Sequence, residues 1–413
     1  MFVGITNTPR PYPWGSSTAI ADLLGRPHSG APEAELWLGA HPGSPSEILD
    51  PAIVGGARNL AEWIADAAAG ALGPGAGAGA GAGSAGGAGD AAPRLPFLMK
   101  VLAAASPLSL QAHPTAEQAR EGFERENLAG VPADAPFRNY KDAFPKPELM
   151  LALSDTFEAL CGFRPAAAVR ETLTELVRAD LGSDGQIDGL LKRLPDDAAL
   201  APAFEWLISR GDGVDELVAS VVTAAAASDS VTRPIEFATI LSLAEQYPGD
   251  PGIVISLLVN RVSLKRGEVL YLPAGNIHAY LFGLCIEVMA ASDNVLRGGL
   301  TPKHVDVPEL LSVLDFSPLP VPYLKPTVIA PGVSVYRPDV PDFVLVHAEG
   351  SGLEATYQLG GPAIALCLSG SFSLCGATSE VSLGRGESVY VTPDERTLTI
   401  AGTGELVLAT PGE

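Results

Sequence analysis

A block of helical character interrupts a chain that otherwise consists of short strand-like runs, and this order limits the folds open to the chain. From Pro165 to about Tyr247, four segments carry apolar residues three to four positions apart, which is the spacing of a buried helix face. They are AAAVRETLTELVRADL, IDGLLKRL, VDELVASVVTAAAA and IEFATILSLAEQY. After the block, short β-branched runs are separated by Gly and Pro, as in sandwiches and barrels. The sequence therefore predicts a mainly β protein with an α insertion.

The strand-rich part after this block contains two similar stretches. LKRGEVLYLPAG (264–275) resembles LGRGESVYVTPD (383–394), since each has a basic residue, a Gly and an acidic residue before an alternating strand and a proline. Only the first stretch is followed by a histidine, His278. We expect two β-barrels, of which the first carries chemistry and the second does not. An accidental likeness between two β turns is the alternative.

The segment from Gly70 to Pro93, GALGPGAGAGAGAGSAGGAGDAAP, differs in composition from the rest of the chain. It has too few large apolar side chains to offset the entropy that would be lost on ordering it. The segment is predicted to be a flexible surface insertion. NLAEWIADAAAG before it is predicted to form a short helix, and LPFLMKVL after it a strand.

Net charge and cysteine content limit the partners and the compartment. A formal net charge of −22 repels polyanions, which argues against nucleic acid and anionic membranes as partners. No apolar stretch approaches the roughly 20 residues that span a bilayer, and the N-terminal residues lack a basic leader followed by an apolar core. Buried free thiols are favoured over disulfides because the cysteines have no CxxC spacing and apolar neighbours: Cys161, Cys285, Cys367 and Cys375. We expect a cytoplasmic protein.

Two segments place polar side chains two residues apart beside apolar runs. In SLQAHP, alternate side chains of a strand share a face, so Ser109, Gln111 and His113 are expected to point the same way. A sheet with one face in water explains this segment equally well. In PKPELMLAL, Lys146 and Glu148 have the same spacing before another apolar run, which favours a site.

A third segment, GEVLYLPAGNIHAYLF, is similar to the second sequence signature of the cupin barrels. Its Gly, Pro-x-Gly and His correspond to Gly267, Pro273, Gly275 and His278, while Phe282 replaces the usual terminal Asn. The glycines and the proline make tight turns, so the histidine is expected to point into the barrel. A lone histidine in an apolar strand is more often a core residue, but the surrounding pattern favours a metal ligand.

Together, the three segments offer two imidazoles, one carboxylate and one amide oxygen, from Gln111, His113, Glu148 and His278. Such a mixed set of nitrogen and oxygen ligands suits zinc or another divalent first-row ion and leaves room for water or substrate.

Six segments resemble the type I mannose-6-phosphate isomerase family, in the same order: YPWGS, AELWLGAHPGSPS, LMKVLAAASPLSLQAHP, YKDAFPKPELMLAL, LPAGNIHAYL and SDNVLRGGLTPKHVD. The resemblance implies a cupin-type catalytic domain made of residues 1–164 and 251–325, a helical domain at 165–250, and a cupin-like domain without metal ligands at 326–413. It also implies one zinc ion per chain, held by the four ligands above, and an active-site arginine at Arg297.

The resemblance implies interconversion of mannose 6-phosphate and fructose 6-phosphate, with a proton moving between C1 and C2 through an enediolate. A divalent cation can stabilise the negative charge on oxygen without redox change, and Arg297 can add fixed positive charge. For the base, Lys146, Asp293 and Glu287 are the candidates. Alternatively, Lys146 binds phosphate and the two acids orient their neighbours. Pro145 replaces a family histidine considered for ring opening, so that role is filled otherwise or is not essential.

The phosphate of the substrate needs cations in this acidic chain. Lys303, Lys100 and the Ser109 hydroxyl are the candidates, with Arg297 able to contribute, although single lysines are more often solvated surface residues. Trp14 and Trp37 either line the mouth of the site or anchor packing. The remaining histidines are expected to be structural or exposed: His28, His41, His304 and His347.

Two other functions compete with the isomerase. A metal-dependent cupin oxygenase would use the same barrel with redox-active iron, but an amide ligand at Gln111 and the absence of an HxH pair argue against it. A catalytically silent sugar-phosphate-binding module is the second alternative, and the complete ligand set together with Arg297 argues against it. We expect a monomer that acts on a small sugar phosphate.

Overall fold

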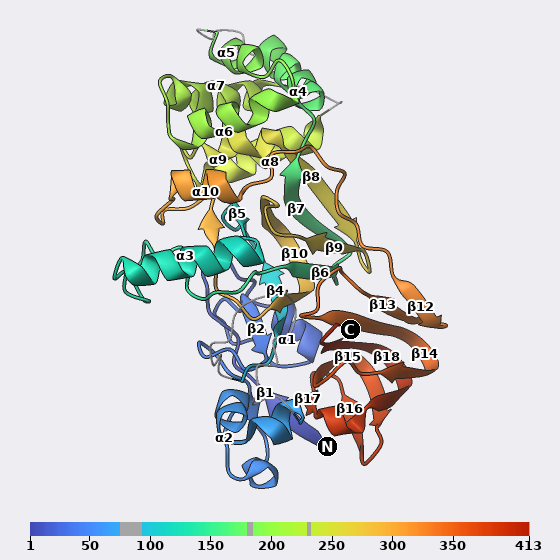
Figure 1. Ribbon diagram of the computed structural model, residues 1–413. Coiled ribbons are helices and arrows are strands. Elements are labelled where there is room, and N and C mark those ends of the chain that lie inside the picture. The colour runs from blue at the N-terminus through green and yellow to red at the C-terminus, as the bar shows by residue number, and fades with distance from the viewer. Residues whose placement is uncertain (75–92, 180–184, 229–232, 413) are drawn as a thin grey trace.

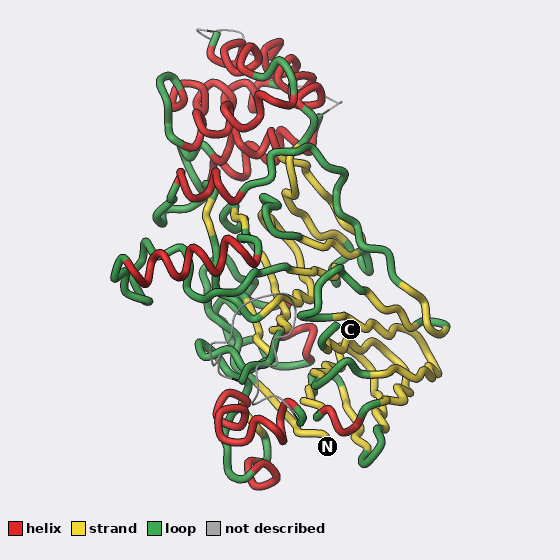
Figure 2. The backbone as a smooth tube through the Cα atoms, viewed as in Figure 1, coloured by secondary structure: helices red, strands yellow, loops and turns green. Residues whose placement is uncertain are grey.

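The chain forms an elongated molecule in which a helical region, a first β region and a second β region follow one another (Figure 1). The structure is a computed structural model that describes residues 1–74, 93–179, 185–228 and 233–412. Figure 2 shows that most helices gather at one end, while the strands lie in the rest of the molecule. The prediction of a mainly β protein with an α insertion is confirmed. Among the described residues, no helix combines the length and the apolar character needed to cross a membrane.

The first β region is organised around β10 (His278–Ala290), the long strand that ends the cupin-like signature. One half of this strand pairs with β4 and β6, and its first residues pair with β5 and β7. Among the described residues, this sheet contains β2 (Glu35–Leu38), β4 (Phe97–Ala104), β5 (Gln111–Ala112), β6 (Glu148–Ala152), β7 (Thr156–Phe163), β8 (Val259–Lys265), β9 (Val269–Leu272), β10 and β11 (Leu296–Arg297). Segments that lie on either side of the helical block in sequence therefore meet in one sheet.

The helical block lies between β7 and β8 and is built as its apolar spacing predicts. Its helices are α4 (Ala166–Ala179), α5 (Gln186–Arg193), α6 (Leu200–Ile208), α7 (Val214–Ala227), α8 (Pro234–Gln246) and α9 (Gly252–Ile255). Their apolar faces share one core with residues of the first sheet, such as Leu160 and Ala279. Helix α6 was not predicted, because Pro202 interrupts its pattern; the proline stands in the first turn, where its missing N–H costs nothing.

Within the described ranges, the α-helices outside the block are α1 (Ala19–Leu24), α2 (Leu60–Leu72), α3 (Ala116–Leu128) and α10 (Val307–Val313). The short helix predicted from NLAEWIADAAAG is α2, and the strand predicted from LPFLMKVL is β4. The predicted flexible insertion falls mainly on residues 75–92, which lie outside the described residues.

The second β region contains the C-terminal strands and also the N-terminal strand of the chain. In the part of the chain that the structure describes, its strands are β1 (Phe2–Thr6), β3 (Glu47–Ile48), β12 (Thr327–Ala330), β13 (Val333–Tyr336), β14 (Val344–Gln358), β15 (Ala363–Cys375), β16 (Glu380–Gly384), β17 (Ser388–Val391) and β18 (Thr397–Thr410). Phe2 is paired with Val391, and buried side chains of both sheets, including Met99 and Leu366, share one core. The predicted domain boundary between residues 325 and 326 stays a prediction. It assigns the N-terminal strand β1 to the first domain, although β1 pairs with a strand of the second β region.

The two similar sequence stretches form turns of the same geometry. In the first, Glu268 accepts a hydrogen bond from the backbone N–H of Lys265 at 2.8 Å, and Gly267 has a φ of 85°. In the second, Glu387 accepts one from Gly384 at 2.7 Å, and Gly386 has a φ of 82°. The positive φ is why a glycine stands at each turn. The likeness of the two stretches is therefore structural.

The cysteines are free, as expected, but they are not all buried. Cys161, Cys285 and Cys367 are buried, while Cys375 is exposed at the end of β15. The expectation of burial was wrong for Cys375, because the other face of this strand end is in water.

Candidate metal centre

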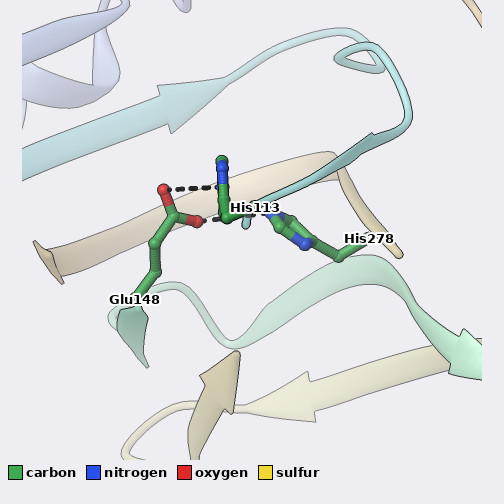
Figure 3. Close-up of side chains that lie close together, drawn as sticks. All are labelled: His113, Glu148 and His278. Atoms are coloured by element: carbon green, nitrogen blue, oxygen red, sulfur yellow. Dashed lines mark ion pairs between the residues drawn. The ribbon is translucent and has the colours of Figure 1, made fainter. Parts of the chain in front are cut away.

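Three buried side chains from different segments of the first sheet converge on one point (Figure 3). His113 follows β5, Glu148 begins β6 and His278 begins β10, and each side chain is about 1% exposed. The Nε2 atom of His113 lies 3.3 Å from Oε1 of Glu148, and that of His278 lies 3.3 Å from Oε2. The sheet therefore assembles residues that are up to 165 positions apart (278 − 113).

The backbone fixes which ring nitrogen of each histidine carries the proton. Nδ1 of His113 lies 2.8 Å from the carbonyl oxygen of Asn294, and Nδ1 of His278 lies 3.0 Å from that of Asn276. Because a carbonyl only accepts, each Nδ1 must carry the hydrogen, so in the neutral ring Nε2 has a bare lone pair. Both lone pairs are directed toward the carboxylate of Glu148.

The charge states suit a cation. Burial lowers the pKa of His113 to about 4, so its ring is neutral near pH 7. Burial alone would raise the pKa of Glu148, but the positive charge of Lys146 holds it well below its usual range. Within the described part of the chain, both Nε2 atoms and Oε2 of Glu148 have no hydrogen-bond partner. Buried electron-pair donors that face one another without a proton between them are stabilised by a metal ion.

Gln111 stands next to this cluster. It pairs with His278 across β5 and β10, and with Arg297 across β5 and β11. Directly paired residues of antiparallel strands project from the same face, so the Gln111 amide and the Arg297 guanidinium share the face of His278. The arrangement brings the fourth predicted ligand and the predicted arginine to the same place.

Comparison with known proteins identifies the family. A sequence model described as "Phosphomannose isomerase type I, catalytic domain" matches residues 2–166. The mannose-6-phosphate isomerase of Escherichia coli (strain K12) is 36% identical over 404 residues, which cover 97% of this chain and 97% of that protein. The human mannose-6-phosphate isomerase is 33% identical over 419 residues, covering 93% and 92%. The chain belongs to the type I mannose-6-phosphate isomerase family.

Solved structures agree with this assignment. A crystal structure of a mannose 6-phosphate isomerase in its zinc-bound form has a TM-score of 0.86 and 34% sequence identity, with both chains covered completely (100%). The apo form from Salmonella typhimurium has a TM-score of 0.85 and 33% identity, covering 100% of this chain and 99% of that one. The predicted resemblance is therefore confirmed over the whole length, including the parts without a recognisable motif.

Another cluster of buried polar side chains, Lys100, Glu287 and Glu35, lies on β4, β10 and β2. The Nζ atom of Lys100 lies 2.9 Å from Glu287 and 3.5 Å from Glu35, and Trp37 donates to Glu35 at 2.9 Å. Burial works against the charged form of Lys100, but the two carboxylates raise its pKa. Burial raises the pKa of Glu287, against the effect of Lys100. Sequence reasoning missed Glu35, although it stands in the segment AELWLGAHPGSPS, two residues before Trp37.

A cationic group surrounds Arg297. Burial lowers the pKa of Lys303, and the charges of Arg297 and Lys141 lower it further, so the three cations lie near one another. None of them forms an ion pair with a residue in the described ranges. Lys141 was not predicted, although it stands in the segment YKDAFPKPEL together with two predicted site residues.

The other predicted residues are placed as follows. Ser109 is half-buried in the link between β4 and β5. Trp14 stacks on Tyr12 with ring centroids 5.8 Å apart and packs against the core of the first sheet, as a packing anchor would. Lys146 is buried, with Nζ 3.1 Å from Oε1 of Glu148. Pro145, which replaces the family histidine, is half-buried beside it.

The last predicted site residue, Asp293, lies between β10 and β11 and has an unexpected partner. Its Oδ2 atom lies 3.0 Å from Nε2 of His41, a histidine that we expected to be structural or exposed. The two residues are 252 positions apart, and no periodic pattern in the sequence connects them. Of the other histidines in that group, His28 pairs with Asp22 at the surface, His304 is exposed, and His347 lies in the second sheet.

Proposed function

We propose that this protein interconverts mannose 6-phosphate and fructose 6-phosphate with the help of one zinc ion per chain. The observation that carries the proposal is the cluster of His113, Glu148 and His278, whose bare lone pairs face one another in a buried site of a mannose-6-phosphate isomerase family member. Relatives with the printed name mannose-6-phosphate isomerase match almost the whole chain, which supports the same reaction here.

The residues present fit the metal. His113, His278, Glu148 and the amide oxygen of Gln111 would hold it, and Nδ1 of each histidine stays bonded to a carbonyl oxygen. When bound, a divalent cation supplies Lewis-acid stabilisation of negative charge on substrate oxygen without any redox change. Lys146 keeps Glu148 ionised, so the carboxylate is available as a ligand.

The protein's own groups move the proton. During isomerisation, a C–H bond at C1 or C2 breaks, its electron pair becomes part of the enediolate, and a base holds the proton before returning it to the other carbon. Asp293 is better placed for this role than Glu287, whose side chain is 4% exposed and bonded to Lys100. Lys146 is the weaker candidate, because its positively charged amine is paired with Glu148 and has no lone pair to accept a proton. Arg297 lies on the face of the ligands and would stabilise the enediolate oxygen.

The phosphate would bind in the cationic group. Arg297 and Lys303 repel each other without substrate, and a phosphate dianion between them would remove that repulsion. The Ser109 hydroxyl is a further candidate donor. Lys100, the fourth candidate, already has two carboxylate partners, which makes it the weakest candidate of the set.

The surroundings of the reaction are part of the same proposal. The protein would act as a monomer in the cytoplasm, where free cysteines persist in the reduced form. Because a net charge of −22 repels anions, the sugar phosphate would bind in a local cationic pocket, and nucleic acid and anionic membranes would have no role.

An isomerase assay tests the function. The purified protein is incubated with mannose 6-phosphate or fructose 6-phosphate, before and after dialysis against a chelator and after return of zinc. We expect interconversion that is lost with the metal and recovered with zinc. Sugar-phosphate binding without turnover would favour the non-catalytic module, and consumption of oxygen with iron would favour the oxygenase.

A further inference from the structure

His41 is held rigidly in the turn that follows β2. Its ring meets the Trp37 ring edge-on, with centroids 4.8 Å apart and planes at 85°. Its Nδ1 atom lies 3.0 Å from the backbone N–H of Gly43, and its Nε2 atom lies 3.0 Å from Oδ2 of Asp293. The side chain is only 10% exposed. Both ring nitrogens and the ring edge are therefore fixed by neighbours.

These contacts decide the direction of the hydrogen bond to Asp293. A backbone N–H only donates, so Nδ1 of His41 must accept with its lone pair. The proton of the neutral ring is then on Nε2, which donates to Oδ2 of the carboxylate. The bond thus exists in both the neutral and the protonated ring.

The backbone of Asp293 is also held by a hydrogen bond, but one oxygen of its carboxylate is free to accept a hydrogen bond. Its backbone N–H donates to Asp142 at 2.8 Å, and its side chain is 47% exposed. Among the described residues, Oδ1 has no hydrogen-bond partner, whereas Oδ2 is occupied by His41. Burial alone would raise the pKa of Asp293, but the hydrogen bond from His41 and the charges of Lys146 and Lys100 lower it.

We propose that His41 is a positioning residue that locks the carboxylate of Asp293, so that only Oδ1 is free to accept a substrate proton and return it. The inference rests on the proposed isomerase function, in which Asp293 is a candidate base. Proton transfer depends steeply on the position and orientation of the base, and a small displacement can cost about a hundredfold in rate. Without His41, the carboxylate can rotate and turn either oxygen toward water.

Three variants separate positioning from packing. His41→Leu keeps the bulk of the ring but removes the donor, while His41→Gln keeps an amide N–H that can reach Asp293. His28→Leu is the matched control, because it breaks a His–Asp hydrogen bond of 2.7 Å at the exposed surface. We expect H41L to lower kcat about ten- to a hundredfold with KM within about threefold. H41Q should recover most of the loss, and H28L should behave as wild type.

A double variant tests whether His41 acts through Asp293. If it does, H41L should have no further effect on kcat when Asp293 is already replaced by asparagine, so H41L/D293N should match D293N. Independent, multiplying losses would overturn the proposal, as would equal losses in H41L and H41Q. Zinc content and thermal unfolding of each variant show whether a loss reflects a damaged fold.

A titration that needs no turnover separates this inference from the proposed function. The Asp293 carboxyl carbon is followed by NMR in selectively labelled wild-type protein, H41L and H41Q. Loss of the donor should raise the pKa of Asp293 in H41L and leave it near the wild-type value in H41Q. An unchanged pKa in H41L would overturn the proposal even if the enzyme is active. A shifted pKa in a protein without isomerase activity would retain the lock on Asp293 and reject only the reaction.

Discussion

The two β regions each contain a cluster of histidine and glutamate side chains, and only one of them has the properties of a metal site. In the first sheet the cluster is His113, Glu148 and His278; in the second it is His347, Glu349 and Glu405. In each cluster, the atoms that could bind a metal lie within 4.8 Å of one another. Residue type and spacing alone therefore do not distinguish them.

The second cluster already has its cation. Glu349 and Glu405 are directly paired across β14 and β18, where two like charges repel. Arg266, from the first of the two similar turns, forms an ion pair with Glu405 and lies 3.5 Å from Glu349. His347 is hydrogen-bonded to Glu405 at 2.9 Å. The first cluster has Lys146 on one oxygen only, so its other donor atoms remain unmatched. Unmatched buried lone pairs are what mark a metal centre here.

The largest expected effect is on the first cluster. His278→Ala should lose bound zinc and lower kcat by more than about a hundredfold, because a missing ligand leaves the cation poorly held. His347→Ala is the matched control and should keep both zinc and activity. Elemental analysis and steady-state kinetics of the two variants decide. Full metal occupancy in H278A, or zinc loss in H347A, would contradict the comparison.

The next largest effect is expected at Arg297, which lies on the same sheet face as the first cluster. Arg297→Ala should lower kcat and kcat/KM by similar factors, about a hundredfold, with zinc retained, because the fixed charge stabilises the enediolate. A rise in KM with kcat unchanged would instead show that Arg297 holds the phosphate equally in ground and transition states. Kinetics at saturating mannose 6-phosphate distinguish the two outcomes.

The sequence could predict the residues of the first cluster because each of them stands in a short segment with a recognisable pattern. Gln111 and His113 are two residues apart on one strand face, and His278 stands in a segment whose glycines and proline define the turn. The helices were predicted where apolar spacing was regular. The sequence also resembled a known family over motifs that contain every predicted ligand.

Contacts between distant segments could not be predicted in this way. His41 meets Asp293, and Arg266 meets Glu405, only because segments far apart in the sequence pack together. The pairing of Phe2 with Val391 is of the same kind. Periodicity reports which face of an element is buried, but it does not report which element covers that face. These contacts therefore required the structure.

A smaller effect tests the cation of the second cluster. Arg266→Met should lower the free energy of unfolding by about 1–3 kcal/mol, because it leaves the paired glutamates without their counter-charge. The side chain is 38% exposed, so the loss should fall below that of a fully buried ion pair. Arg385→Met is the matched control: Arg385 holds the same place in the second turn but bonds to the neutral carbonyls of Asp22 and Leu23. Denaturant unfolding should show a larger loss for R266M than for R385M.

The smallest effect asks whether the arginine is what keeps metal out of the second cluster. In R266M, His347 and the two glutamates would retain a nitrogen and carboxylate oxygens close together, with no cation between them. Added zinc should then raise the stability of R266M by about 1 kcal/mol once its concentration exceeds the dissociation constant several-fold. The wild-type protein, whose first site is already filled, should show no such rise, and neither should R266M/H347A, which lacks the nitrogen ligand. Zinc-dependent thermal unfolding measures all three. If zinc does not raise the stability of R266M, the ligand atoms of the second cluster are not arranged in a geometry that binds zinc. The two clusters would then differ in the arrangement of their ligand atoms and not only in charge.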